Sequence, residues 1–178
     1  KTVFRSKENG KDDPDKKECL KDIRFGPLYN KVLLRYLEER GIYTDVALFN
    51  CEEVRYTLHG KRYFAIGFKN LELRSRLFKG SLSPKDISLI NNGSDTCDLF
   101  EGFIDYLSWM VLGLGCGDDY LVLNSVALLK RSYGFLDRYE HIRCYLDRDE
   151  AGRRTLEALR NRYGNKIEDC SALYKGYK

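Results

Sequence analysis

The sequence predicts an α/β protein: a parallel sheet with helices on both faces, preceded by a small mixed α+β lobe that contains an antiparallel hairpin. Two observations predict this arrangement. Residues 53–90 alternate apolar and polar side chains between turn residues, as antiparallel strands do. Further along, short apolar segments alternate with longer helical stretches, which is the pattern of βαβ units and of a parallel sheet.

The composition limits the size and the class of the protein. A chain of 178 residues that is 43% hydrophobic can bury one main core, or one core plus a small lobe. Its formal net charge of +4 is only mildly basic, so contacts with nucleic acid must come from local clusters of Lys and Arg. No apolar run approaches the roughly 20 residues that cross a bilayer. We therefore expect a soluble, cytoplasmic monomer without a membrane partner.

The cysteines and the first residues indicate an intracellular fragment. The six cysteines are scattered and never form a CxxC pair, which disfavours both a zinc ribbon and a disulfide framework, so we expect reduced thiols. The chain begins at Lys1 with neither an initiator Met nor the pattern of a signal peptide. Residues 1–18 are almost entirely charged or small, with Gly10 and Pro14 as breakers, and this predicts a linker that follows an upstream segment.

Residues 19–94 are expected to form the basic N-terminal lobe. The stretch 27–41 predicts an amphipathic helix that ends at Arg40-Gly41, and one face of it carries Leu28, Val32, Leu33, Tyr36 and Leu37. The antiparallel sheet follows, with turns at His59-Gly60 and Lys69-Asn70. Its basic side chains are Lys61, Arg62, Lys69, Arg74, Arg76 and Lys79. A loop at 81–97 leads to the second half of the chain.

Residues 95–178 are expected to form the α/β domain. The predicted strands are 97–100, 120–124, 142–146 and 167–170. The predicted helices are 103–113, 125–133 and 150–163.

Acidic side chains follow two of these strands at the point where each strand ends. Asp147 and Asp149 come directly after the strand 142–146, and Glu101 follows the strand 97–100. Ligands of open α/β sheets bind at the carboxyl ends of the strands. Carboxylates held close together raise each other's pKa unless a cation neutralises them, and oxygen ligands suit Mg²⁺ or Mn²⁺. A metal site is therefore our hypothesis for this edge of the sheet.

Each of these residues also has a structural interpretation, which the sequence leaves open. A strand that ends in DxD is also typical of a turn whose acids cap the next helix. Asp105 either joins the acids as an accessory ligand or complements the positive end of its helix. Arg153 and Arg154 either bind phosphate or form a solvated helix face.

Two segments resemble the Toprim domain, an α/β metal-binding fold of primases, topoisomerases and nucleases. The family has a Glu after its first strand, here in LFEGFIDYLS at 99–108, and a DxD after a later strand, here in CYLDRDEAGRRT at 144–155, with Gly152 at the family's glycine. Within the family, the sequence is most similar to bacterial DnaG-type primases. YLEERGI at 36–42, GKRYFAIGFKN at 60–70 and FKGSLSPKDI at 78–87 each resemble a primase segment.

The sequence also departs from the primase pattern. Phe68-Lys69-Asn70 replaces a glycine pair and a terminal arginine, and Phe78-Lys79 replaces Pro-Lys. The amino-terminal zinc-binding domain of primases is missing from this stretch, and whether the parent protein carries one stays open. The chain ends near the point where the family continues with a further acidic motif. These departures leave two alternatives open: the catalytic core of a divergent primase from a plasmid or mobile element, or a relative that has lost polymerase activity.

The resemblance implies a function and a set of roles. A DNA primase makes short RNA primers on single-stranded DNA by metal-dependent nucleotidyl transfer, so the implied partners are the DNA template, ribonucleotides and a replicative helicase. The implied catalytic and metal-binding residues are Glu101, Asp147 and Asp149, with Mg²⁺ or Mn²⁺. Phosphate or nucleotide binding falls to Arg153 and Arg154, and nucleic-acid binding to Lys61, Arg62, Lys69 and Lys79. The alternatives are a Toprim nuclease and a non-catalytic Toprim scaffold that binds DNA or a replication or mobilisation partner.

Overall fold

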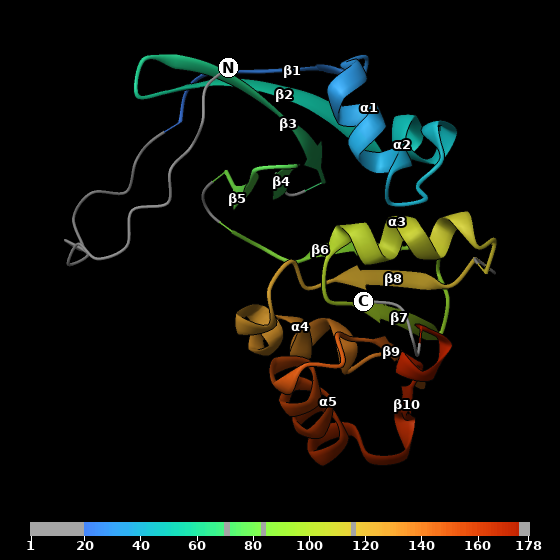
Figure 1. Cartoon of the computed structure of the whole chain (residues 1–178). Helices are drawn as coiled ribbons and strands as arrows, with labels where there is room; N and C mark the ends of the chain where they lie inside the picture. The colour runs from blue at the N-terminus through green and yellow to red at the C-terminus, as the bar shows by residue number, and fades with distance from the viewer. Residues whose placement is uncertain (1–19, 70–71, 83–84, 115–116, 175–178) are drawn as a thin grey trace.

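The structure is a computed structural model that describes residues 20–69, 72–82, 85–114 and 117–174 (Figure 1). The predicted linker at 1–18 lies outside these residues. Within them, Cys51, Cys97, Cys144 and Cys170 are buried free thiols. None of the helices in the described ranges is both long enough and apolar enough to cross a membrane.

The first sheet is antiparallel and five-stranded, with its strands in sequence order. Its strands are β1 (Lys21–Pro27), β2 (Cys51–Leu58), β3 (Lys61–Phe68), β4 (Glu72–Ser75) and β5 (Phe78–Ser81). The predicted hairpin is β2–β3, and its turn at His59-Gly60 places both residues at positive φ. Strand β1 is absent from the sequence prediction because nearly all of its side chains are exposed, so it shows no buried face.

Two short helices connect β1 to β2. They are α1 (Lys31–Glu38) and α2 (Thr44–Asn50). The side chain of Asn30 accepts a hydrogen bond from the backbone N–H of Val32 at 3.0 Å, so the helix predicted over 27–41 begins only after this cap. Leu33, Tyr36 and Leu37 are buried as predicted, but Val32 is 59% exposed, and its assignment to the apolar face was wrong. Helix α2 was not predicted.

The second sheet is mixed, with four parallel strands and one antiparallel edge strand, in the order β10-β9-β7-β8-β6. Its strands are β6 (Ser88–Ile90), β7 (Thr96–Phe100), β8 (Asp119–Val122), β9 (His141–Tyr145) and β10 (Ile167–Asp169). The parallel strands confirm the βαβ prediction. The loop predicted at 81–97 was wrong in part, because it contains β6, which pairs antiparallel with β8.

Helices cover both faces of this second sheet, as predicted. The α-helices are α3 (Phe103–Val111), α4 (Leu129–Leu136) and α5 (Glu150–Tyr163), and the short 3₁₀ turns are η1 (Val126–Leu128), η2 (Gly164–Lys166) and η3 (Ser171–Tyr174). Helix α3 lies between the two sheets, whereas α4 and α5 lie on the far side of the second sheet (Figure 1).

One hydrophobic core joins the two lobes through α3. The ring of Phe68, at the end of β3, stacks on Phe103, at the start of α3, with centroids 5.1 Å apart and an interplanar angle of 8°. Beneath α3, Phe100 stacks on Tyr145 at 4.9 Å. Leu33 and Leu37 of α1 belong to the same cluster. Aromatic pairs of this kind contribute about 0.5–1.5 kcal/mol each beyond the burial of their surface. The first lobe is therefore anchored on the residues that directly follow Glu101.

The second sheet also contains a buried ion pair that the sequence analysis did not identify. Asp98, in the central strand β7, is 0% exposed. Arg143 lies opposite it on β9 and donates two hydrogen bonds to its carboxylate, at 2.6 and 3.0 Å. Burial raises the pKa of Asp98, and the hydrogen bonds from Arg143 oppose that shift. Arg143 also pairs with Asp118.

Replacing Arg143 with Met should destabilise the fold, because it leaves the Asp98 carboxylate buried without its cation. We expect the free energy of unfolding at pH 7 to fall by about 3 kcal/mol, as measured by urea denaturation. The double variant Asp98→Leu/Arg143→Met removes both charges and should recover at least half of the loss. A single variant as stable as the wild type would show that the pair contributes little.

Candidate functional site

Glu101 and Asp147 lie together because β7 and β9 are neighbouring parallel strands. Phe100 pairs with Tyr145 in the register, so both strands end at the same edge of the sheet. Glu101 directly follows β7, and Asp147 lies two residues after β9. The backbone N–H of Asp147 donates a hydrogen bond to Oε2 of Glu101 at 3.3 Å. The two strand ends are therefore neighbours, as the hypothesis of a metal site at this edge of the sheet requires.

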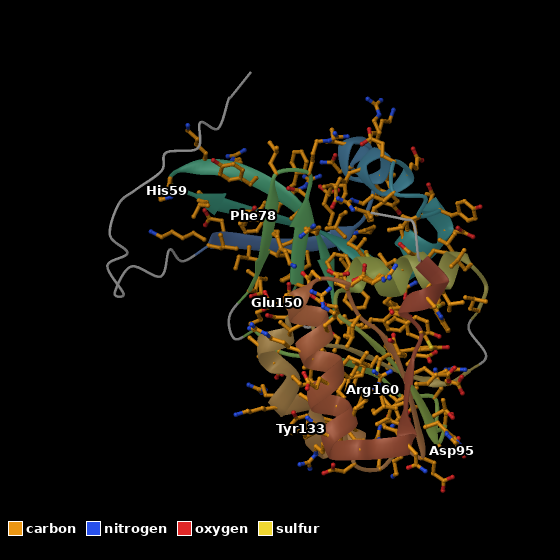
Figure 2. All side chains as sticks on the ribbon, turned by 60° about the horizontal axis from the view of Figure 1, so that its bottom comes forward. His59, Phe78, Asp95, Tyr133, Glu150 and Arg160 are labelled. Atoms are coloured by element: carbon orange, nitrogen blue, oxygen red, sulfur yellow. The ribbon has the colours of Figure 1, made fainter. Side chains whose placement is uncertain are left out.

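This edge of the sheet faces the antiparallel lobe. In Figure 2, Glu150, the first residue of α5, lies toward the lobe that carries His59 and Phe78. Asp95, just before β7, lies at the opposite end of the domain. The carboxyl ends of the parallel strands therefore open toward the first lobe.

Glu101 is held in surroundings that disfavour its charge. Its burial raises the pKa of its carboxyl group, and the negative charge of Asp147 raises it further. The N–H of Asp147 opposes the shift, while the charges of Asp149 and Asp105 add to it. The carboxylates thus act on one another through space, and a cation placed among them would relieve the repulsion.

Asp105 both caps its helix and belongs to this acidic group. Its carboxylate accepts a hydrogen bond from the backbone N–H of Gly102 at 3.0 Å, before the first turn of α3. The side chain reaches solvent, yet the protein around it removes enough hydration to raise its pKa to about 6, with a further contribution from Asp147. Lys79, on β5, lowers the pKa of Asp105. The two interpretations left open for Asp105 are therefore compatible.

Asp149 is the N-cap of α5. Its Oδ1 accepts a hydrogen bond from the backbone N–H of Gly152 at 2.8 Å, so the capping interpretation of the DxD acids holds for this residue. A carboxylate that caps a helix through one oxygen keeps a second oxygen for a ligand. Among the described residues, no three His, Cys, Asp or Glu side chains are gathered in a group that could hold a metal ion. The acids share an edge of the sheet without converging on one point.

Gly152 allows α5 to begin against the end of the strand. A Cβ atom at this position would lie 1.8 Å from the carbonyl oxygen of Asp147, far inside any contact distance. The close approach holds the DxD segment between β9 and the first turn of α5.

The two predicted phosphate-binding arginines differ in their surroundings. Arg153 donates from Nη1 to the carbonyl oxygen of Arg148 at 2.6 Å, so it lies against the DxD loop. Arg154 forms an ion pair with Glu150, and both side chains are exposed. The sequence analysis did not consider Arg148, although its position between two acids was an available clue.

The predicted nucleic-acid-binding residues lie at two ends of β3. Lys61 and Arg62 begin this strand beside the hairpin turn, and Lys69 directly follows its inner end, where Phe68 packs on α3. Seven residue steps separate the two ends, or about 23 Å along the strand. Lys79 is close enough to the acids to lower the pKa of Asp105. Lys69 and Lys79 thus lie on the site's side of the lobe, and the other two lie far from it.

Three aromatic residues of β3 also have different surroundings. Phe68 is buried in the shared core. Tyr63 stacks on Tyr56 with ring centroids 5.7 Å apart. Phe64 is 40% exposed, so it presents an accessible ring.

Comparisons with known proteins agree with this fold. Residues 99–178 match the family described as Toprim-like, and residues 22–83 match a domain of unknown function (DUF8464). No curated protein matches the chain. The domain 99–178 therefore has a Toprim-like fold.

Two solved structures from bacteriophage T7 are similar. The crystal structure of the primase fragment of its primase-helicase protein has a TM-score of 0.51 and 20% identity, and the match covers 84% of this chain and 66% of that one. The second structure is that of the T7 lagging-strand DNA polymerase interacting with primase domains of two gp4 subunits bound to an RNA/DNA hybrid and dTTP. Its matched chain has a TM-score of 0.46 and 19% identity, and the match covers 83% of this chain and 77% of that one. At these identities the likeness concerns the fold.

The pKa of Asp105 leads to a prediction about stability. Because its folded-state pKa of about 6 lies above the ordinary value of 3.8, ionisation destabilises the fold, and the cost develops as the pH rises from about 4 to above 6. Asp105→Asn keeps an acceptor for Gly102 but removes the charge. In EDTA, we expect the free energy of unfolding of the variant, relative to that of wild type, to increase by about 1 kcal/mol between pH 4 and pH 8, after allowance for solvent screening. Urea denaturation at both pH values measures this, and a difference that is independent of pH would contradict it.

Proposed function

We propose that this chain is the catalytic core of a DNA primase, which makes short RNA primers on single-stranded DNA by metal-dependent nucleotidyl transfer. The observation that carries the proposal is the pairing of β7 with β9, which brings Glu101 to the N–H of Asp147 in a Toprim-like fold. The DnaG-type origin, and a replicative helicase as partner, belong to the same proposal and rest on the sequence motifs.

The acids suit a divalent metal. Glu101, Asp147 and Asp149 offer only carboxylate oxygens, the ligands that Mg²⁺ and Mn²⁺ prefer. Burial raises the pKa of Glu101 most, and the negative charges of Asp147, Asp149 and Asp105 raise it further; a cation would offset that negative charge. When bound, such ions supply charge neutralisation for the triphosphate and alignment of the attacking 3′-hydroxyl group. Asp105 adds a fourth carboxylate next to this group.

The basic residues around the acids provide sites for the substrates. Lys69 and Lys79 lie on the lobe that faces the acids, where their ammonium groups attract the phosphates of a primer, a template or a nucleotide. Arg153 and Arg154 begin α5 on the same side of the domain and would bind phosphate oxygens. These cations hold the polyanionic substrates close to a site whose own charge repels them.

The register of the first sheet determines which basic side chains share a face that a template strand could follow. Side chains that pair across strands point to the same face, and alternate residues along one strand do likewise. Ile66 pairs with Arg74, which pairs with Lys79, so Lys79 shares a face with Arg62 and Phe64 of β3. Lys61 points to the opposite face. We propose that single-stranded DNA follows the face of Arg62 and Lys79, with the exposed ring of Phe64 available for base stacking.

A non-catalytic scaffold is the second candidate. Two of the acids already accept backbone hydrogen bonds, Glu101 from Asp147 and Asp149 from Gly152, and such bonds are also typical of a purely structural loop. A scaffold would fold normally and bind DNA without measurable metal binding. A Toprim nuclease would use the same acids but would degrade DNA in the presence of metal without added nucleotides.

The decisive test combines metal binding with RNA synthesis. We expect the chain, supplied with single-stranded DNA, ribonucleotides and Mg²⁺ or Mn²⁺, to make short RNA, and Glu101→Gln to abolish it. In a Mn²⁺ titration the same variant should bind at least about 10-fold more weakly, because the amide lacks the negative charge. Glu150→Gln is the matched control, since this exposed acid is adjacent to Asp149 but pairs with Arg154.

The outcomes separate the candidates. Glu101→Gln should keep the wild-type circular dichroism spectrum, which shows that the loss is not due to misfolding. If wild type binds Mn²⁺ and degrades DNA without making RNA, the chain is a nuclease. If wild type binds no Mn²⁺ and makes no RNA, the primase proposal fails in favour of the scaffold.

The register gives a further prediction about DNA binding. Arg62→Ala should weaken the binding of oligonucleotides of different sequence about equally and reduce the salt dependence of log K by about 0.7, the value for one phosphate contact on a single strand. Lys61→Ala removes the same charge from the neighbouring residue, on the opposite face, and should have a smaller effect. Fluorescence anisotropy at several salt concentrations measures both. Equal effects of the two substitutions would show that DNA binding does not depend on which face of the first sheet carries the charge.

A further inference from the structure

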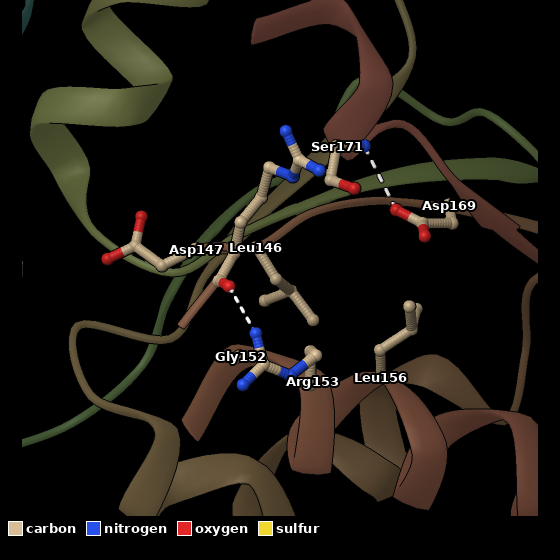
Figure 3. Close-up of a pocket in the computed structure, with 8 residues that line it drawn as sticks. Leu146, Asp147, Gly152, Arg153, Leu156, Asp169 and Ser171 are labelled. Atoms are coloured by element: carbon tan, nitrogen blue, oxygen red, sulfur yellow. Dashed lines mark hydrogen bonds between the residues drawn. The ribbon is translucent and has the colours of Figure 1, made fainter. Parts of the chain in front are cut away.

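The loop that carries the DxD acids also borders a pocket on its other side. This pocket has a volume of about 230 Å³ and lies between the end of β9, the first two turns of α5 and the residues after β10 (Figure 3). Its lining consists of Leu146, Asp147, Arg148, Gly152, Arg153, Leu156, Asp169 and Ser171. It is called the arginine pocket below.

The lining combines an apolar wall with two arginines. The partly buried Leu156 provides aliphatic surface, and the largely buried Leu146 lies beside it in the lining. In Figure 3 both leucines point into the space between the loop and α5, together with Arg153. Arg148 completes the lining from within the DxD sequence. An apolar surface next to cationic groups suits a ligand that has a ring and an anion.

The guanidinium group of Arg153 is held in place but keeps donors for a ligand. Nη1 of Arg153 donates to the carbonyl oxygen of Arg148 at 2.6 Å, which fixes the side chain across the loop. The carbonyl oxygen engages a single N–H, whereas a guanidinium has five. In the described part of the chain, neither Arg148 nor Arg153 forms an ion pair with a carboxylate.

The acids at the pocket do not cancel this positive charge. Oδ1 of Asp169 accepts a hydrogen bond from the backbone N–H of Ser171 at 2.9 Å, and Oδ2 lies 3.8 Å from Arg160 outside the pocket. Figure 3 shows the carboxylate of Asp147 directed away from Arg153 and Leu156. The pocket therefore presents two guanidinium groups that lack a counter-ion within it.

We propose that the arginine pocket binds one phosphate-bearing nucleotide unit, with the phosphate on Arg148 and Arg153 and the ring against Leu146 and Leu156. Guanidinium groups bind phosphate through paired, charge-assisted hydrogen bonds. A volume of 230 Å³ is below the roughly 300 Å³ at which ligand pockets usually begin, so it accommodates a single nucleotide unit at most. The unit comes either from a free nucleotide or from the phosphorylated end of a strand.

This site is distinct from the acidic site but shares its loop, and in it Arg153 keeps the phosphate-binding role proposed above, on the side of the loop away from the carboxylates. Asp147 lines the arginine pocket, while Figure 3 shows its carboxylate directed away from Arg153 and Leu156. The proposal requires neither the acids nor a metal ion, so it stands or fails independently of primer synthesis.

The test measures nucleotide binding in EDTA, where the acids have no metal through which to hold phosphate. We expect AMP to bind the chain at least about 10-fold more tightly than adenosine, because the phosphate adds charge-assisted hydrogen bonds. Arg148→Ala and Arg153→Ala should each weaken AMP binding about 10-fold. Lys130→Ala is the matched control: it removes one positive charge from an exposed position on α4 that does not line the pocket.

The location and the source of the nucleotide need separate measurements. Methyl NMR should show the signals of Leu146 and Leu156 shifting with AMP, as expected for a ring against the apolar wall. A 5′-phosphorylated oligonucleotide that displaces AMP better than its unphosphorylated form would identify a strand end as the ligand, and no displacement would identify the free nucleotide. The proposal is overturned if AMP and adenosine bind alike, if the three variants lose affinity equally, or if the leucine signals do not move.

Discussion

The stacking of Phe68 on Phe103 is the contact on which the relation between the two lobes depends. One ring ends the hairpin strand β3, and the other begins α3, two residues after Glu101. Because the same core continues to Phe100 and Tyr145 beneath α3, the antiparallel sheet and the parallel sheet are packed as one body around this helix. Lys79 of the first lobe is thereby held close enough to the acidic group to lower the pKa of Asp105.

The strands β7 and β9 carry charged groups in the middle of their length and just beyond their carboxyl ends, and the two sets are compensated differently. In the middle of these strands, Asp98 is fully buried, and its charge is matched by Arg143 from the adjacent strand. At the carboxyl ends, no ion pair with a cation is found for Glu101 or Asp147 among the described residues, and burial together with the negative charge of Asp147 raises the pKa of Glu101. The fold thus neutralises the carboxylate that is buried within the sheet, whereas the repulsion between acids is found at the edge of the sheet, where a ligand can reach it.

The second half of the fold followed from the sequence because hydrophobic periodicity and strand-end chemistry agreed there. The apolar run before Asp147 and the helical pattern from Glu150 to Tyr163 define β9 and α5 with little ambiguity. Strand β1 and edge strand β6 could not be predicted in the same way, since exposed or three-residue strands depend on pairing with distant residues.

The candidate site, too, could be predicted from the sequence only in part. Its acids were identifiable because each follows a strand directly, and their adjacency followed from the expected parallel sheet. The arginine pocket was not identifiable, because it depends on how the residues after β10 fold back beside α5. The pairing of Asp98 with Arg143 depends on strand order, which periodicity does not reveal. Local sequence thus predicted the acids, whereas contacts between distant segments determine what surrounds them.

The close contact between Gly152 and the backbone of Asp147 limits which mutations this protein tolerates. The carbonyl oxygen of Asp147 occupies the volume that any side chain at residue 152 would need. A chance replacement there would force α5 away from the end of β9, and the N-cap at Asp149 and the backbone contact with Glu101 would both shift with it. One change at an uncharged residue would thus disable three acids that it leaves chemically intact, so the position is expected to be as intolerant of variation as the carboxylates themselves.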